Sequence, residues 1–60
     1  MQTQHNTYYD IVNTQGTSAL LPDQPYFRAR ASALDERDAI ALRVGNTVPL
    51  YVVERDAPRP

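Results

Sequence analysis

The sequence predicts an α+β fold, a small two-layer ββαβ domain in which one helix packs on a three-stranded sheet. Three observations predict it. Stretches rich in β-branched and aromatic residues, typical of strands, lie at 7–13 and 47–56. A stretch of alternating side chains lies at 26–31. A segment with helical periodicity separates that stretch from the last predicted strand.

The first two strands are expected to form a hairpin. Residues 7–13, TYYDIVN, form the first strand, and the TQG that follows forms the turn. The return strand begins near residues 17–21 and is then interrupted, because Pro22 and Pro25 cannot donate hydrogen bonds to a sheet. It resumes over residues 26–31 and completes the hairpin.

The helix is expected to begin at Ser32 and to end before Gly45 and Asn46. The Ser32 hydroxyl can cap the first turn, and Asp35 three residues later makes a weaker form of the capping box. Arg43 near the end suits the helix dipole, and the glycine suits a C-cap. The apolar residues of this helix form one stripe centred on Arg37: Ala33, Leu34, Ile40, Ala41 and Val44.

The third strand is expected over residues 47–56, with Pro49 near its beginning. A right-handed crossover through the helix would give the strand order 2-1-3, with the first strand in the middle and antiparallel to both neighbours. We expect residues 1–6 to form a disordered polar leader, residues 7–56 a single domain, and residues 57–60 a flexible Pro-rich tail.

The two faces of this sheet are expected to differ, because one helix with one apolar stripe covers only one of them. Strand alternation places on the covered face Tyr9, Ile11, Phe27, Ala29, Ala31, Val48, Leu50 and Val52. The opposite face stays open, with Asp10 in the middle strand and Arg55 in the third. The residues expected to bind a partner on this face are Tyr8, Val12, Tyr26, Arg28, Arg30, Tyr51 and Val53.

The composition of the open face favours a protein interface. Contiguous exposed apolar area usually marks an interaction site, and tyrosine and arginine are enriched in interface hot spots. Two alternatives stay open. Strand propensity alone accounts for tyrosine and valine, and a one-residue slip in register would exchange the faces. The sequence thus predicts a small non-enzymatic module, regulatory or structural, that dimerises or docks on a larger protein.

A nucleic-acid-binding protein is the alternative function. Tyr8, Tyr26 and Tyr51 could stack on bases while Arg28, Arg30 and Arg55 hold phosphate. Against it, the formal net charge is −1, so no overall positive field attracts nucleic acid. Asp10 also projects from the middle of the same face, and protein contact remains the favoured interpretation.

No catalytic or metal-binding constellation is expected. The chain has no cysteine and a single histidine, His5, so neither a metal site nor a base for a serine nucleophile can be assembled. Asp35 and Asp38 lie near the helix start, where negative charge is favourable in itself. We therefore expect no enzyme activity, no cofactor and no small-molecule substrate.

The remaining expectations concern partners and location. A 60-residue chain without disulfides has a small core, which favours self-association or docking on a protein partner. All six cations are arginine, as is typical of a GC-rich genome such as that of an actinobacterium or its phage. No apolar run is long enough for a membrane span, and the start of the chain does not resemble a signal peptide. We expect a location in the cytoplasm of a host cell or in a virion.

Overall fold

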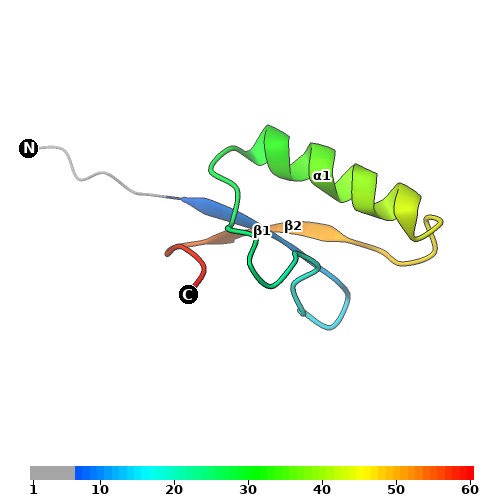
Figure 1. The fold of residues 1–60 in the computed structure, drawn as a ribbon, viewed down its shortest axis with the longest axis horizontal. Helices are drawn as coiled ribbons and strands as arrows, with labels where there is room; N and C mark the ends of the chain where they lie inside the picture. Colours follow the sequence, from blue (N-terminus) through cyan, green and yellow to red (C-terminus); the bar gives the residue numbers. More distant parts are fainter. Residues whose placement is uncertain (1–6) are drawn as a thin grey trace, which may run out of the picture.

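The structure, a computed structural model, describes residues 7–60 and has one helix over a small sheet. Its elements are, in order, β1 (Tyr8–Val12), α1 (Arg30–Arg43) and β2 (Tyr51–Arg55). Figure 1 shows α1 above one face of the β1–β2 pair. The long connection from β1 to α1 loops out below the sheet, and the C-terminal segment curls back on that side (Figure 1). The molecule is thus a small α+β fold.

The prediction of a three-stranded ββαβ sheet in the order 2-1-3 is wrong. Within the described residues the sheet has two strands, β1 and β2, which pair antiparallel. Their register runs without interruption from Tyr8↔Arg55 to Val12↔Tyr51. The last strand is also shorter than predicted, because it begins at Tyr51 and the residues from 47 to 50 belong to the loop after α1.

The segment predicted as the second strand follows the free edge of β1, but its backbone pairs with β1 only at two isolated bridges among the described residues. These bridges are Tyr9↔Phe27 and Val12↔Ser18. Between them β1 advances by three residues, whereas the facing segment advances by nine. The surplus residues must leave the sheet, and the two prolines in this stretch cannot donate hydrogen bonds to it. The segment is therefore a loop held at two points.

The helix begins earlier than predicted. Its N-cap is Ala29, in an extended conformation with φ −121° and ψ 132°, and no side chain caps the first turn. Ser32 is the third helical residue and is exposed, so it is not the cap. Arg30 and Ala31 are both good helix formers, which explains why they join the helix rather than a strand.

The predicted helix stop at Gly45 and Asn46 is confirmed. The Gly45 N–H donates to the Leu42 carbonyl at 3.2 Å, and the Asn46 N–H donates to the Ala41 carbonyl at 2.7 Å. These two bonds form a Schellman motif, which satisfies carbonyls at the end of the helix. Gly45 has φ +77° and Asn46 φ +58°, the left-handed region that glycine and asparagine tolerate best.

The apolar core is small. Ile11 of β1 and Ala33 of α1 have no exposed surface, and they mark where the helix packs on the sheet. Val12 and Leu20 are each 6% exposed. Ala29 and Ala31, predicted for the core, are exposed, because they lie at the start of the helix and not on a strand. Two larger residues predicted for the core are also exposed: Val44 at 45% and Val48 at 44%. Both come after the last helical residue, where no element of the described chain covers them.

Candidate functional site

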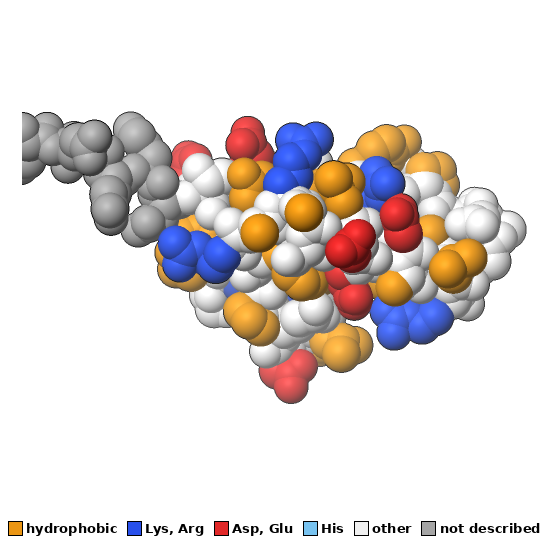
Figure 2. Space-filling model, turned by 90° about the horizontal axis from the view of Figure 1, so that it is seen from above, with side chains coloured by type: hydrophobic (Ala, Val, Ile, Leu, Met, Phe, Trp, Pro, Cys, Tyr) orange, Lys and Arg blue, Asp and Glu red, His pale blue; other side chains and the backbone are white. Residues whose placement is uncertain are grey.

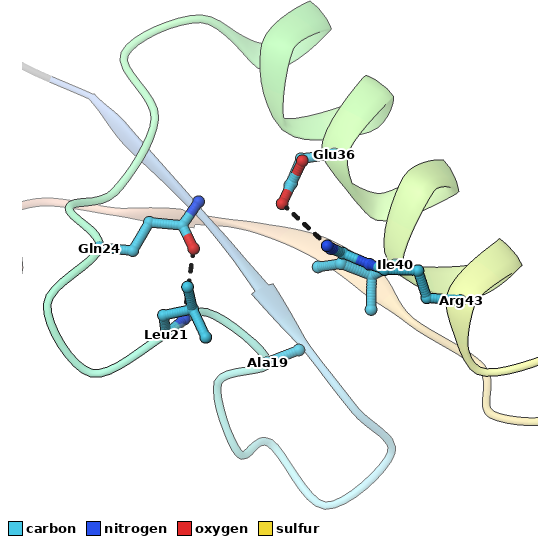
Figure 3. A pocket seen from close by; sticks show the side chains of 6 residues that line it. All are labelled: Ala19, Leu21, Gln24, Glu36, Ile40 and Arg43. Atoms are coloured by element: carbon cyan, nitrogen blue, oxygen red, sulfur yellow. Dashed lines mark hydrogen bonds and ion pairs between the residues drawn. The ribbon is translucent and has the colours of Figure 1, made fainter.

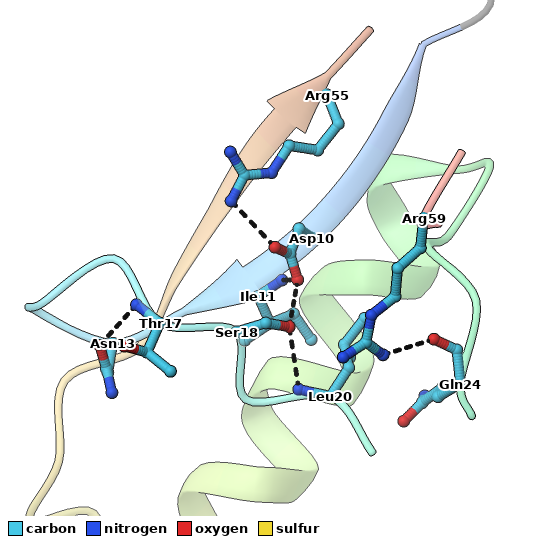
Figure 4. A network of polar contacts seen from close by, with 9 residues as sticks. All are labelled: Asp10, Ile11, Asn13, Thr17, Ser18, Leu20, Gln24, Arg55 and Arg59. Carbon is cyan, nitrogen blue, oxygen red and sulfur yellow. Dashed lines mark hydrogen bonds and ion pairs between the residues drawn. The ribbon is translucent and has the colours of Figure 1, made fainter. Parts of the chain in front are cut away.

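A buried carboxylate organises the face of the sheet opposite α1. Asp10 of β1 is 1% exposed. Its Oδ1 accepts hydrogen bonds from the Ile11 N–H at 2.8 Å and from the Ser18 hydroxyl at 2.7 Å. Its Oδ2 accepts from Nη2 of Arg55 at 3.0 Å, and Figure 4 shows these contacts converging from β2 and the loop. A buried carboxylate requires such hydrogen bonds to both of its oxygens, because it has lost its contact with water.

The same hydrogen bonds hold the loop over the middle of the sheet face that was predicted to be open. The Ser18 hydroxyl donates to Asp10 and so joins the loop to β1, and it accepts from the Leu20 N–H at 3.3 Å within the loop. Val12, opposite Ser18, is consequently buried. The expectation that Val12 is exposed and available to a partner is therefore wrong, because the loop covers it.

The C-terminal segment is joined to this loop through Arg59. Nη1 of Arg59 donates to the Gln24 carbonyl at 2.7 Å and also to the Leu21 carbonyl. Figure 4 shows the guanidinium reaching from the C-terminal segment toward the loop residues. Loop residues and C-terminal residues therefore lie together beside β1.

The tyrosines and Arg28 of the predicted site remain accessible to different extents. The Arg28 guanidinium lies 4.7 Å from the centre of the Tyr8 ring, a cation–π contact between the loop and β1. Tyr51 is 51% exposed, whereas Tyr8, Tyr26 and Val53 are half-buried. We call the set Tyr8, Tyr26, Arg28, Tyr51 and Val53 the aromatic face.

Arg30 does not join the aromatic face. The sequence places it on a strand with Arg28, but the structure places it in the first turn of α1, where it is exposed. The strand alternation from which Arg30 was assigned does not continue past Ala29, because the helix begins there. Arg30 therefore cannot share a strand face with Arg28.

Most arginines are engaged within the chain. Arg37 pairs with Asp38 at 3.0 Å, and Arg43 approaches Glu36 at 3.5 Å. Within the described residues, five of the six arginines have an intramolecular partner: Arg28, Arg37, Arg43, Arg55 and Arg59. These contacts leave few cations free to hold phosphate.

A second exposed surface includes Leu42, for which the sequence leaves three interpretations open: ordinary surface, a place beneath the loop at Leu20 and Leu21, or a second contact patch. Leu42 is 73% exposed, and with Val44, Val48 and Tyr51 it falls in the ten residues that connect the end of α1 to the start of β2. Figure 2 shows hydrophobic side chains at this end of the molecule, on the right in both views. We call these four residues the apolar end. The position of Leu42 outside the helix stripe was the available sequence signal.

A shallow groove lies between α1 and the loop (Figure 3). Its volume is about 260 Å³ and its lining residues are Ala19, Leu21, Gln24, Glu36, Ile40 and Arg43. Leu21 at one side is 66% exposed, and the Glu36–Arg43 pair lies at the other. Small-molecule sites usually have volumes of about 300–1,000 Å³, so this groove is smaller than a typical substrate site.

Among the described residues the structure assembles no group of three or more His, Asp or Glu side chains that could hold a metal ion. Ser18 is hydrogen-bonded to the Asp10 carboxylate, but that carboxylate is already bonded to Arg55 and to a backbone N–H.

No helix within residues 7–60 has the length and apolar character needed to cross a membrane.

Comparison of the chain with protein-family models, curated proteins and solved structures finds no match.

Proposed function

We propose that this chain is a non-enzymatic protein-binding module. One observation carries the proposal: within the described residues, more large apolar side chains are exposed than buried. Five are between 44% and 73% exposed, namely Leu21, Leu42, Val44, Val48 and Tyr51, whereas the buried apolar residues are Ile11, Val12, Leu20 and Ala33. Apolar side chains that lie together on a surface usually serve an interaction.

The binding surface combines the apolar end with the aromatic face, and Tyr51 belongs to both. Tyr51 is a large side chain at the start of β2, so it can contribute to a contact centred on either set. Tyrosine and arginine with aliphatic neighbours are the residue types that dominate measured interface energies. A partner that covers the exposed leucine and valine side chains would gain about 25 cal/mol for each Å² of apolar surface buried.

Nucleic-acid binding is the second candidate, and the Tyr8–Arg28 stack is the observation that favours it. A stacked aromatic ring and guanidinium are typical of single-strand binding surfaces. The intramolecular pairing of most other arginines argues against it, because phosphate contacts need several free cations. The two candidates differ in salt dependence, since only nucleic-acid binding weakens steeply as salt rises.

The test compares two variants with the unchanged chain. Leu42→Ser removes an apolar contact from the apolar end, and Tyr26→Ser removes one from the aromatic face. Asp23→Ser, at an exposed loop position, is the control. Partners are captured from an extract of the source cell and identified, and each affinity is then measured with purified proteins by calorimetry, after circular dichroism confirms that every variant is folded.

We expect at least one of the two variants to bind the purified partner about tenfold more weakly, which corresponds to about 1.4 kcal/mol. Asp23→Ser should bind as the unchanged chain does. If every captured protein binds all variants equally, the proposal is wrong. If instead single-stranded nucleic acid binds, and Arg28→Ala reduces both affinity and salt dependence, the second candidate is correct.

A further inference from the structure

β2 forms one outer edge of the sheet. Within the described residues, β2 pairs with β1 alone. The backbone groups of Tyr9 and Ile11 bond to the loop on the far side of β1: Tyr9 exchanges two bonds with Phe27, and the Ile11 carbonyl accepts from Ala19. In an antiparallel pair, alternate residues point their N–H and C=O groups to opposite sides. The other residues of β1 therefore point their backbone groups toward β2.

The same alternation identifies the free backbone groups of β2. The residues opposite Tyr8, Asp10 and Val12 are Arg55, Val53 and Tyr51, so these point their backbone groups toward β1. Val52 and Glu54 lie between them. Their N–H and C=O groups therefore face outward, along the edge with which no described segment pairs.

This edge has few of the features that prevent strands from pairing. Residues 51–55 contain no proline and no lysine, which are common protections of sheet edges. The five pairs with β1 run in unbroken register, so no bulge twists the edge away. Tyr51 at one end of the strand is half exposed, which leaves a large side chain beside the edge.

We propose that two copies of this chain pair antiparallel along β2, with Val53 of both copies at the two-fold axis. In three symmetric registers, centred on residue 52, 53 or 54, the outward N–H and C=O groups of one copy face those of the other copy. Centring on residue 54 places Glu54 opposite its own copy, and like charges directly opposite are destabilising. Centring on residue 52 pairs only three residues of the strand with strand residues. Centring on Val53 pairs all five.

In the chosen register the paired side chains are compatible. Val53 meets its copy, Tyr51 meets Arg55, and Val52 meets Glu54, so no two like charges are opposite. Tyr51 and Arg55 repeat a combination that the chain already uses, since Tyr8 lies opposite Arg55 in the β1–β2 pair and beneath Arg28. Opposed aromatic and cationic side chains attract each other.

The resulting dimer has a four-stranded sheet in the order β1-β2-β2-β1. Because the two-fold axis is perpendicular to the sheet, both copies of α1 lie on the same face. A two-stranded sheet is marginal by itself, and extending it to four strands supplies backbone hydrogen bonds that one chain lacks. This pairing does not depend on the proposed function, since it uses the backbone of the strand edge and neither Leu42 nor Tyr26.

The first test of the register uses engineered cysteines, because the natural chain has none. At the axis Val53 occupies a non-hydrogen-bonded pair, in which the Cα atoms are about 4.5 Å apart. This distance falls inside the range of about 4.4–6.8 Å that disulfides need. Val53→Cys should therefore form a covalent dimer when oxidised glutathione is added to a dilute sample.

Two controls measure unspecific oxidation. Val52→Cys is adjacent in the strand but diagonal to its own copy, about 7–8 Å away, which is too far for a disulfide. Leu42→Cys is highly exposed and distant from the strand. If Val53→Cys forms no more covalent dimer than these controls, the proposed register is wrong. A dimer packed through sheet faces would also fail to link Val53, because stacked sheets are about 10 Å apart.

The second test removes one outward N–H. Glu54→Pro removes a backbone N–H that faces the free edge, and it leaves the hydrogen bonds between β2 and β1 in place. Glu54→Ala changes only the side chain. Light scattering after size exclusion should give twice the 6.8 kDa of one chain for the unchanged protein and for Glu54→Ala. Glu54→Pro should give a single-chain mass while circular dichroism shows it folded.

Two results would overturn the proposal: a single-chain mass for the unchanged protein at every concentration, or a folded Glu54→Pro that remains dimeric. If Glu54→Pro does not fold, the cysteine experiment decides alone. Neither result bears on the proposed function, which Leu42→Ser and Tyr26→Ser test.

Discussion

At the scale of single residues, Asp10 is the side chain on which the sheet's second face depends. It receives one backbone N–H, one hydroxyl and one guanidinium, from β1, the loop and β2. The Arg55 guanidinium pairs with Asp10, and its buried Nε has no hydrogen-bond partner among the described residues. Removing the carboxylate would leave a guanidinium and a hydroxyl without their acceptor.

Asp10→Ala should lower the free energy of unfolding by about 1–3 kcal/mol, because the Ile11 N–H and the Ser18 hydroxyl lose their acceptor, whereas the Arg55 side chain is 40% exposed and can be hydrated. The matched control is Asp38→Ala. Asp38 also accepts from an arginine at 3.0 Å, but its side chain is 66% exposed. Its loss should change stability by at most about 0.5 kcal/mol. Urea unfolding followed by circular dichroism measures both, and equal effects would contradict the role of burial.

At the scale of elements, the helix shows which local signals were reliable. Its C-terminal end follows the sequence, because glycine and asparagine are suited to the positive φ values that a Schellman motif needs. Its N-terminal end differs from the start that the sequence predicted at Ser32. Ser32 is a good capping residue, but a helix that already has Arg30 and Ala31 in its first turn has no use for a cap at that position.

The capping position can be tested by moving the hydroxyl. Ala29→Ser places a capping side chain at the observed N-cap and should stabilise the protein by about 0.5–1 kcal/mol. Ser32→Ala should change stability by less than about 0.5 kcal/mol, since alanine is a good helix former and no cap is lost. Thermal unfolding compares the two variants. A loss of about 1 kcal/mol in Ser32→Ala would mean that the helix begins at Ser32 after all.

At the scale of the whole molecule, the apolar side chains fall into a buried group and an exposed group. The core is centred on Ile11 and Ala33, where α1 crosses the sheet. Leu42, Val44 and Val48 lie outside it. We attribute the first group to folding and assign the second to binding in our proposal.

This division predicts that substitutions in the two groups lower the free energy of unfolding by different amounts. Ile11→Val removes one methylene from the core and should cost about 1 kcal/mol in the free energy of unfolding. Val48→Ala removes more apolar surface, but from a side chain that is 44% exposed and outside the core. It should cost less than about 0.5 kcal/mol. Denaturant titrations at one protein concentration measure both, and a Val48 effect as large as that of Ile11 would place Val48 in the core.

Several features follow from the sequence by itself. The α+β class, the strands YYDIV and YVVER, the end of the helix and the alternation of residues in both strands depend on interactions between near neighbours. Such signals act within a few residues, so the sequence expresses them directly. The grouping of Tyr8 with Tyr51 and Val53 on one face belongs to this class, because it depends only on period two and on register.

The tertiary structure decided which surfaces are exposed. Alternation places Val12 on the second face, but only the loop held by Ser18 and Asp10 shows that Val12 is covered. The same is true of Val48, whose exposure depends on the path of the chain after α1. Contacts between residues far apart in the chain carry no periodic signature, since they depend on loop paths. For this reason the sequence indicated a two-sided sheet, and only the structure showed which part of its second face is open.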